Sequence, residues 1–146
     1  VRFVMAGSGD KMQAMIDLVA ERGIADKVHF PGFLKGKQVT QMLADSDVYM
    51  MPSVSEPFGI SPLEAMQVGT PSIVSKQSGC AEILDHAIKT DYWDIDAMAD
   101  AIYAIVEYPA IYQTLSKEGR YEVNRITWDK AGLKVRDIYN AVVYRD

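Results

Sequence analysis

Two acidic side chains that could bind a ligand, Glu56 and Glu64, stand with seven residues between them, including one glycine and two prolines. This segment follows an apolar run at residues 48–51, which predicts a buried strand, and it leads into a predicted helix at residues 62–68. In α/β proteins, anions commonly bind where a strand ends and a loop leads into the start of a helix. The pattern therefore has two interpretations, a ligand site or an ordinary helix start.

The backbone of this loop is suited to an anion. Gly59 can adopt a φ angle that other residues resist, and Pro62 suits the first position of a helix, where a missing N–H is no loss. The N–H groups of Gly59, Ile60 and Ser61 are then expected to point outward from the positive end of the helix. Such a nest favours a phosphate or diphosphate, and the helix dipole contributes about 0.3–1 kcal/mol per exposed charge.

The two carboxylates differ in what else explains them. Glu64 lies three residues after Ser61, so it fits a capping box in which it reaches back to the Ser61 N–H. Its alternative role is to accept hydrogen bonds from a diol, as acidic residues do for ribose in nucleotide sites. Glu56 has no capping role, and its plain interpretation is a solvated loop acid. Because an acid in an anion-binding turn is unfavourable without a partner, Glu56 is the stronger functional candidate.

The apolar periodicity predicts alternating strands and helices. The first run, residues 1–6, is continuously apolar apart from Arg2, which is typical of a parallel strand covered on both faces. The alternation predicts an α/β fold, a Rossmann-like parallel sheet with helices on both faces, ending in helices. We expect strands at residues 1–6, 27–31, 47–51, 72–74 and 87–90, helices at residues 11–22, 36–44, 62–68, 95–106 and 109–124, a helical turn at 81–84, and a core-facing apolar stripe from Trp128 to Val142.

A glycine turn follows the first predicted strand, at Gly7-Ser8-Gly9. A dinucleotide fingerprint needs a third small residue three positions after the second glycine, and that position is Met12. A dehydrogenase-type cofactor domain is therefore the third-ranked hypothesis, and a tight strand-to-helix turn is the plainer interpretation.

Composition narrows the class of protein. The 146 residues suffice for one domain with a core, and the net charge of −5 argues against binding to a nucleic-acid backbone. One cysteine excludes an internal disulfide and favours a reducing compartment, so we expect a cytoplasmic protein. With only two histidines and one cysteine, a zinc cluster is not expected. A chain that opens on Val1 in a strand pattern is expected to be a piece of a longer protein.

The segment from Glu56 to Val74 reads Glu-Pro-Phe-Gly-Ile-Ser-Pro-Leu-Glu-Ala-Met-Gln-Val-Gly-Thr-Pro-Ser-Ile-Val. It closely resembles the motif of glycosyltransferase group 1, a large retaining family with the GT-B fold to which bacterial and archaeal glycogen synthases are related. Residues 4–10, 28–33, 44–53 and 78–82 also resemble segments of that family, so the resemblance extends over nearly the whole chain.

The resemblance implies the C-terminal of two Rossmann-like domains, the one that binds the nucleotide-sugar donor. Residues 1–146 would form this single domain, without its first strand and without the N-terminal acceptor domain. The stripe from Trp128 would then be the helix that returns toward the other domain, as an alternative to core. Glu56 would be the catalytic residue, facing the donor sugar and the reaction centre, and Glu64 would bind the ribose hydroxyls. The implied substrate-binding residues are Gly59, Ile60 and Ser61, whose amides would hold the diphosphate, Phe58 in the same loop, Phe33 and Leu34 beside the base, Gly7 in the first turn, and Ser78 and Gly79 near the phosphates and sugar.

The implied reaction is glycosyl transfer with retention at the anomeric carbon, from a UDP-, ADP- or GDP-sugar to a glycan, lipid or glucan acceptor. Neither a metal nor another cofactor is expected, and no nucleic-acid partner. Peripheral membrane association of the full-length enzyme stays open. The chain departs from the family in two ways. The family's Arg and Lys that neutralise the leaving diphosphate lie upstream of the point where this chain begins, which leaves Lys76 as a candidate substitute. Ser78-Gly79 stands where the family has two glycines. The alternative function is a non-catalytic nucleotide- or phosphate-binding module.

Overall fold

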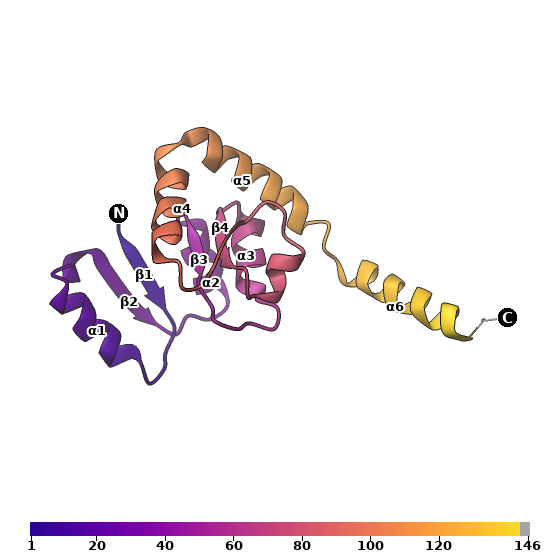
Figure 1. Cartoon of the computed structure of the whole chain (residues 1–146), viewed down its shortest axis with the longest axis horizontal. Coiled ribbons are helices and arrows are strands. Elements are labelled where there is room, and N and C mark those ends of the chain that lie inside the picture. Colours follow the sequence, from indigo (N-terminus) through magenta and orange to yellow (C-terminus); the bar gives the residue numbers. More distant parts are fainter. Residues whose placement is uncertain (144–146) are drawn as a thin grey trace. The chain divides into compact units, whose positions relative to one another are not determined.

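The computed structural model describes residues 1–143, and its contacts fall into two compact units, Val1–Gln41 and Met42–Asp146. Figure 1 traces the chain through them, with the first unit in indigo and violet. We describe each unit by itself. The expected organisation as one nucleotide-sugar-binding domain stays a prediction.

The first unit pairs two parallel strands. β1 (Phe3–Ala6) lies beside β2 (Val28–Gly32), with Phe3 opposite Val28 and a register shift before Ala6. Between them run α1 (Met12–Glu21) and a short 3₁₀ turn, η1 (Ala25–Lys27). The predicted parallel pairing is confirmed, but the predicted cover on both faces is wrong, because every residue of β1 is exposed. Apolar continuity selects strand residues, whereas burial depends on what packs against them, and α1 also has no buried residue.

The second unit contains a three-stranded parallel sheet in the order β3-β4-β5. Its strands are β3 (Tyr49–Met51), β4 (Ser72–Ser75) and β5 (Ile88–Thr90). β4, the central strand, is buried along its whole length, as expected where both faces are covered. The accompanying helices are α2 (Lys37–Ala44, which spans the boundary between the units), α3 (Ile60–Val68), the 3₁₀ turn η2 (Gly79–Glu82), α4 (Ile95–Glu107), α5 (Pro109–Val123) and α6 (Trp128–Val143).

Two apolar clusters form the core of the second unit. One joins Met66 of α3 to Val74 of β4 and Leu84. The other joins Ile73, on the opposite side of the same strand, to Ile105 of α4. α5 packs along both α3 and α4. The α/β class with parallel strands is therefore confirmed, and β4 is the element around which the core is built.

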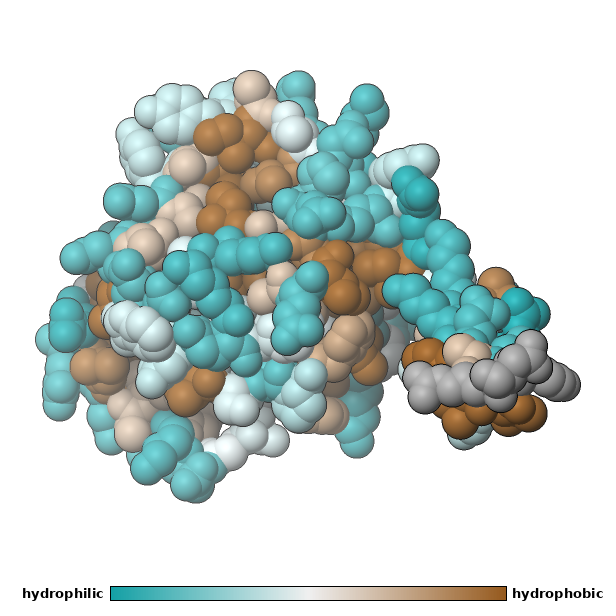
Figure 2. All heavy atoms as spheres, turned by 45° about the vertical axis from the view of Figure 1, so that its right-hand side comes forward, coloured by the Kyte–Doolittle hydropathy of each residue, from teal (hydrophilic) through white to brown (hydrophobic). Residues whose placement is uncertain are grey.

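The interpretation of the C-terminal stripe as core is wrong for the described residues. The alternative from the family resemblance, a helix that returns toward the other domain, stays a prediction. α6 has no buried residue, and Trp128 at its start is 91% exposed. Apolar side chains of α6 are visible at the surface as brown spheres in Figure 2. None of the helices in the described part of the chain is both long and apolar enough to cross a membrane.

Candidate functional site

The loop between β3 and α3 carries the first glutamate and is tied to the loop that follows β4. Glu56 forms an isolated parallel bridge with Ser78. The Gly79 N–H donates to the Glu56 carbonyl oxygen at 2.9 Å, and the Cys80 N–H donates to the Phe58 carbonyl oxygen at 2.7 Å. The backbone on both sides of Pro57 is therefore held in place by η2 and the residue before it.

A buried hydroxyl anchors the start of the same loop. Ser75, at the end of β4, is fully buried, and its Oγ donates to the Ser53 carbonyl oxygen at 2.6 Å. This bond ties the loop to the central strand of the sheet.

We expect Ser75→Ala to lower the free energy of unfolding by about 1–3 kcal/mol, because the Ser53 carbonyl loses its donor while partly shielded from water. Ser55→Ala is the matched control, since Ser55 is exposed in the same loop, and it should change stability by less than about 0.5 kcal/mol. Urea denaturation measures both. Equal effects of the two substitutions would contradict the assigned anchor.

α3 begins two residues earlier than the sequence pattern predicts. Gly59 is the N-cap, with φ 89°, and Ile60 is the first helical residue, so Pro62 is third rather than first. The capping box from Ser61 to Glu64 is therefore wrong, because Ser61 is already inside the helix. The reason is tertiary: the anchored loop delivers the chain at Gly59, whose φ only glycine adopts readily. Pro62 still costs nothing, because the third N–H of a helix has no intrahelical acceptor either.

The early start leaves three backbone donors at the beginning of α3. Backbone hydrogen bonds among the described residues include none from the N–H groups of Gly59, Ile60 or Ser61. These groups lie at the positive end of the α3 dipole. They are candidate donors for an anion, and all three residues line the same cleft as Glu56.

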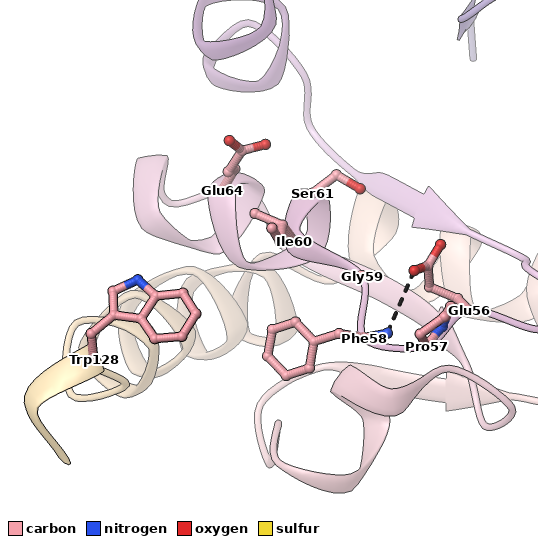
Figure 3. A pocket seen from close by; sticks show the side chains of 8 residues that line it. All are labelled: Glu56, Pro57, Phe58, Gly59, Ile60, Ser61, Glu64 and Trp128. Carbon is pink, nitrogen blue, oxygen red and sulfur yellow. Dashed lines mark hydrogen bonds between the residues drawn. The ribbon is translucent and has the colours of Figure 1, made fainter. Parts of the chain in front are cut away.

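Both glutamates and these donors line one open cleft of about 740 Å³. Figure 3 shows Glu64 on the first turns of α3, Glu56 on the preceding loop, and the Phe58 ring and the Trp128 indole along one side of the opening. The Glu56 Oε1 accepts from the Phe58 N–H at 3.5 Å, a long hydrogen bond that leaves most of the carboxylate available. The lining residues are Glu56, Pro57, Phe58, Gly59, Ile60, Ser61, Glu64 and Trp128.

A tyrosine of β3 contacts one of the residues that line the cleft. Tyr49 Oη donates to Ser61 Oγ at 2.7 Å, and Ser61 Oγ lies 3.9 Å from Met51 Sδ. Burial raises the pKa of the Tyr49 phenol above its ordinary value, with smaller opposing and reinforcing effects from Ser61 and the nearby acids. The phenol therefore stays protonated at neutral pH and remains a donor.

The loop after β4 supports the site more than it lines it. Ser78 is buried, and both its N–H and its Oγ donate to the Ser75 carbonyl oxygen, so its donors are occupied. The Gly79 N–H is likewise bonded to Glu56. The predicted contact of Ser78 and Gly79 with phosphate or sugar stays a prediction.

Lys76, a candidate for neutralising a diphosphate, is engaged elsewhere. Its Nζ lies 2.8 Å from Asp91 Oδ2, and Gln77 donates to the other oxygen of that carboxylate. Hydrogen bonds from Lys76 and then Gln77 lower the pKa of Asp91 below its ordinary value. The ammonium is therefore shared with a carboxylate outside the cleft.

The remaining predicted residues lie together in the first unit. The Gly7 N–H donates to the Gly32 carbonyl oxygen at 2.8 Å, so the glycine turn and the segment after β2 meet at the carboxyl ends of the two strands. Phe33 follows directly and is 66% exposed, and Leu34 is half-buried. This edge is where α/β folds bind ligands. The roles of Gly7, Phe33 and Leu34 stay predictions.

Two residues of the site do not emerge from the sequence pattern. Tyr49 lies in an apolar run, where its only signal is that a buried phenol needs a hydrogen-bond partner. Trp128 lies 64 positions after Glu64, and no spacing rule links it to the loop. Sequence periodicity assigns both to the core.

The chain matches known proteins over most of its length. Residues 1–122 match the sequence profile of the family described as "Glycosyl transferases group 1". An uncharacterized glycosyltransferase of Methanocaldococcus jannaschii is 32% identical over 143 residues, covering 94% of this chain and 36% of that protein. The chain thus spans about a third of the length of this curated relative.

Solved structures share the fold. The sucrose-phosphate synthase of Thermosynechococcus elongatus matches 96% of this chain and 38% of its own, with 28% identity and a TM-score of 0.80. Anabaena HepE, solved with UDP and glucose, matches 97% of this chain and 41% of its own, with 20% identity and a TM-score of 0.84. This chain belongs to the glycosyltransferase group 1 family, and its α/β fold is that of GT-B glycosyltransferases.

Proposed function

We propose that this chain is the donor-binding part of a retaining glycosyltransferase that transfers a sugar from a nucleoside-diphosphate sugar to an acceptor held by another domain. The observation that carries the proposal is that Glu56, Glu64 and three N–H groups at the start of α3, which have no backbone acceptor among the described residues, line the same cleft. The UDP in the HepE structure supports a nucleotide ligand for this fold.

Each part of the cleft matches one part of the donor. The N–H groups of Gly59, Ile60 and Ser61 donate to the diphosphate, where the dipole of α3 also favours negative charge. Glu64, released from the capping role, accepts hydrogen bonds from the ribose hydroxyls. Glu56 faces the sugar and the anomeric carbon. Phe58 borders the sugar between them.

The reaction forms a bond from the acceptor oxygen to the anomeric carbon as the bond from that carbon to the diphosphate breaks. The electron pair of the broken bond goes to the diphosphate oxygen, and the acceptor's hydroxyl proton is released with the diphosphate. Donors fixed at that oxygen before the reaction stabilise the charge as it develops, which is the main catalytic effect of such groups. The residues assigned here act without a metal or other cofactor.

Calorimetric titration of the 146-residue chain with UDP, ADP and GDP tests the proposal. We expect one of the three to bind, with Glu64→Gln weakening that binding by about 10-fold, since hydrogen bonds to charged groups contribute about 1.5–3 kcal/mol. No binding by any of them at millimolar concentration would contradict the proposed function. We expect negligible transfer by this chain alone, and robust turnover would show that it needs no further domain.

The alternative, a non-catalytic nucleotide- or phosphate-binding module, uses the same N–H groups but needs neither glutamate. It predicts nucleotide binding that is insensitive to substitution of both acids. Substitution of Glu56 and Glu64 therefore distinguishes the two functions, whereas nucleotide binding by the wild type does not.

Trp128 provides a spectroscopic test of the cleft. The chain has two tryptophans, and only Trp128 lines the cleft, whereas Trp93 stacks edge-on against Tyr92. A nucleotide bound in the cleft should change the emission of the exposed indole of Trp128. We expect Trp128→Phe to abolish the ligand-dependent change and Trp93→Phe to preserve it. The reverse result would place the ligand elsewhere.

A further inference from the structure

The hydroxyl of Ser61 has a proton without a strong acceptor. A serine hydroxyl carries one donor and two acceptor lone pairs, and Tyr49 Oη occupies one lone pair at 2.7 Å. Among the described residues, the partner for its own proton is Met51 Sδ at 3.9 Å, and a thioether is a weak acceptor. The donor is therefore available to a ligand.

The sheet and the core hold Tyr49 in place. Its N–H donates to the Pro71 carbonyl oxygen at 2.9 Å, and its Cα pairs with Ser72 in the sheet. Its ring packs half-buried against the apolar cluster that contains Met66. Because the ring is fixed by the strand and the core, its hydroxyl has a fixed position relative to the first turn of α3.

We propose that Tyr49 is a positioning residue that, by donating to Ser61 Oγ, turns the Ser61 hydroxyl toward the cleft, where it donates to a diphosphate oxygen of the donor. Ser61 then supplies two donors, its N–H and its hydroxyl, from the second position of α3. This inference rests on the proposed function, because it needs a diphosphate at this place.

A purely structural role of the same bond makes a different prediction. If Tyr49 and Ser61 only tie β3 to α3, their loss weakens every ligand contact of the cleft together with stability. If Tyr49 orients the hydroxyl, its loss acts through Ser61 alone and only on ligands that carry the diphosphate. The two roles are therefore separable by a double-mutant cycle.

The experiment titrates the wild-type chain, Tyr49→Phe, Ser61→Ala and the double variant with whichever of UDP, ADP and GDP the wild type binds. We expect Ser61→Ala to weaken binding about 10-fold, as for loss of one hydrogen bond to a charged group. Tyr49→Phe should weaken it about 3-fold, and the double variant by about 10-fold rather than by the 30-fold product. Ser61→Thr, which keeps the hydroxyl, should retain near wild-type affinity.

Two controls complete the cycle. Tyr139→Phe removes the same atom from an exposed tyrosine of α6 and should not change the affinity. The corresponding nucleoside lacks the phosphates. It should bind with equal affinity to the wild type, Tyr49→Phe, Ser61→Ala and the double variant. Multiplicative effects, an unchanged affinity of Tyr49→Phe, or equal losses for nucleoside and diphosphate would each overturn the inference. Absence of nucleotide binding by the wild type would instead contradict the proposed function, and with it the inference that rests on that function.

Discussion

Replacing Glu56 by Gln is expected to lower the rate of sugar transfer by about 10²–10³-fold in the longer enzyme of which we propose this chain to be the donor-binding part. The substitution keeps the size of the side chain and its long hydrogen bond from the Phe58 N–H, but it removes the negative charge. A fixed charge or donor aimed at a reacting centre is commonly worth this factor. Nucleotide affinity should change less than about 3-fold, because Glu56 faces the sugar in the proposed arrangement.

The measurement is a single-turnover transfer assay together with calorimetric titration of the same protein. Glu107→Gln is the matched control, since Glu107 is an exposed glutamate at the end of α4, outside the lining of the cleft. It should leave both rate and affinity unchanged. An unchanged transfer rate in Glu56→Gln would favour the non-catalytic module.

Replacing Gly79 by Ala should lower the free energy of unfolding by about 3 kcal/mol, the upper part of the usual range for overpacking. A Cβ at this position would lie 2.1 Å from the Pro57 carbonyl oxygen and 3.1 Å from the Phe58 Cα. Both are backbone atoms, so they cannot rotate away. The φ of Gly79 lies outside the left-handed region, so the expected cost is steric and not conformational.

The same substitution should also weaken nucleotide binding. Relief of the clash moves the loop that contains Glu56 and Phe58, and it lengthens the hydrogen bonds from Gly79 and Cys80 to that loop. Gly132→Ala is the control, because its added Cβ meets nothing within 4 Å in α6. It should be neutral or stabilising by up to about 1 kcal/mol, as for an exposed helical glycine. Urea denaturation and titration measure both effects, and a Gly79→Ala protein of wild-type stability would contradict the close approach.

Much of the fold follows from local pattern. Short apolar runs bounded by Gly and Pro locate the five strands within a few residues, and the end of α3 at Gly69 is set by a left-handed glycine whose N–H bonds back into the helix. These features depend on residues adjacent in sequence. Burial does not, and so the exposure of β1 and α6 could not be predicted from their apolar composition.

The candidate site divides in the same way. By itself the sequence determined that Glu56 and Glu64 flank a glycine-bearing turn between a strand and a helix, because that motif is contiguous. Only the tertiary structure decided where α3 begins. Contacts from Gly79 and Cys80 fix the loop and bring the chain to Gly59, which frees Glu64 from capping and leaves three N–H groups without a backbone acceptor. The partners of the site, Tyr49 below Ser61 and Trp128 at its rim, come from distant positions, and their approach depends on packing that no local spacing encodes.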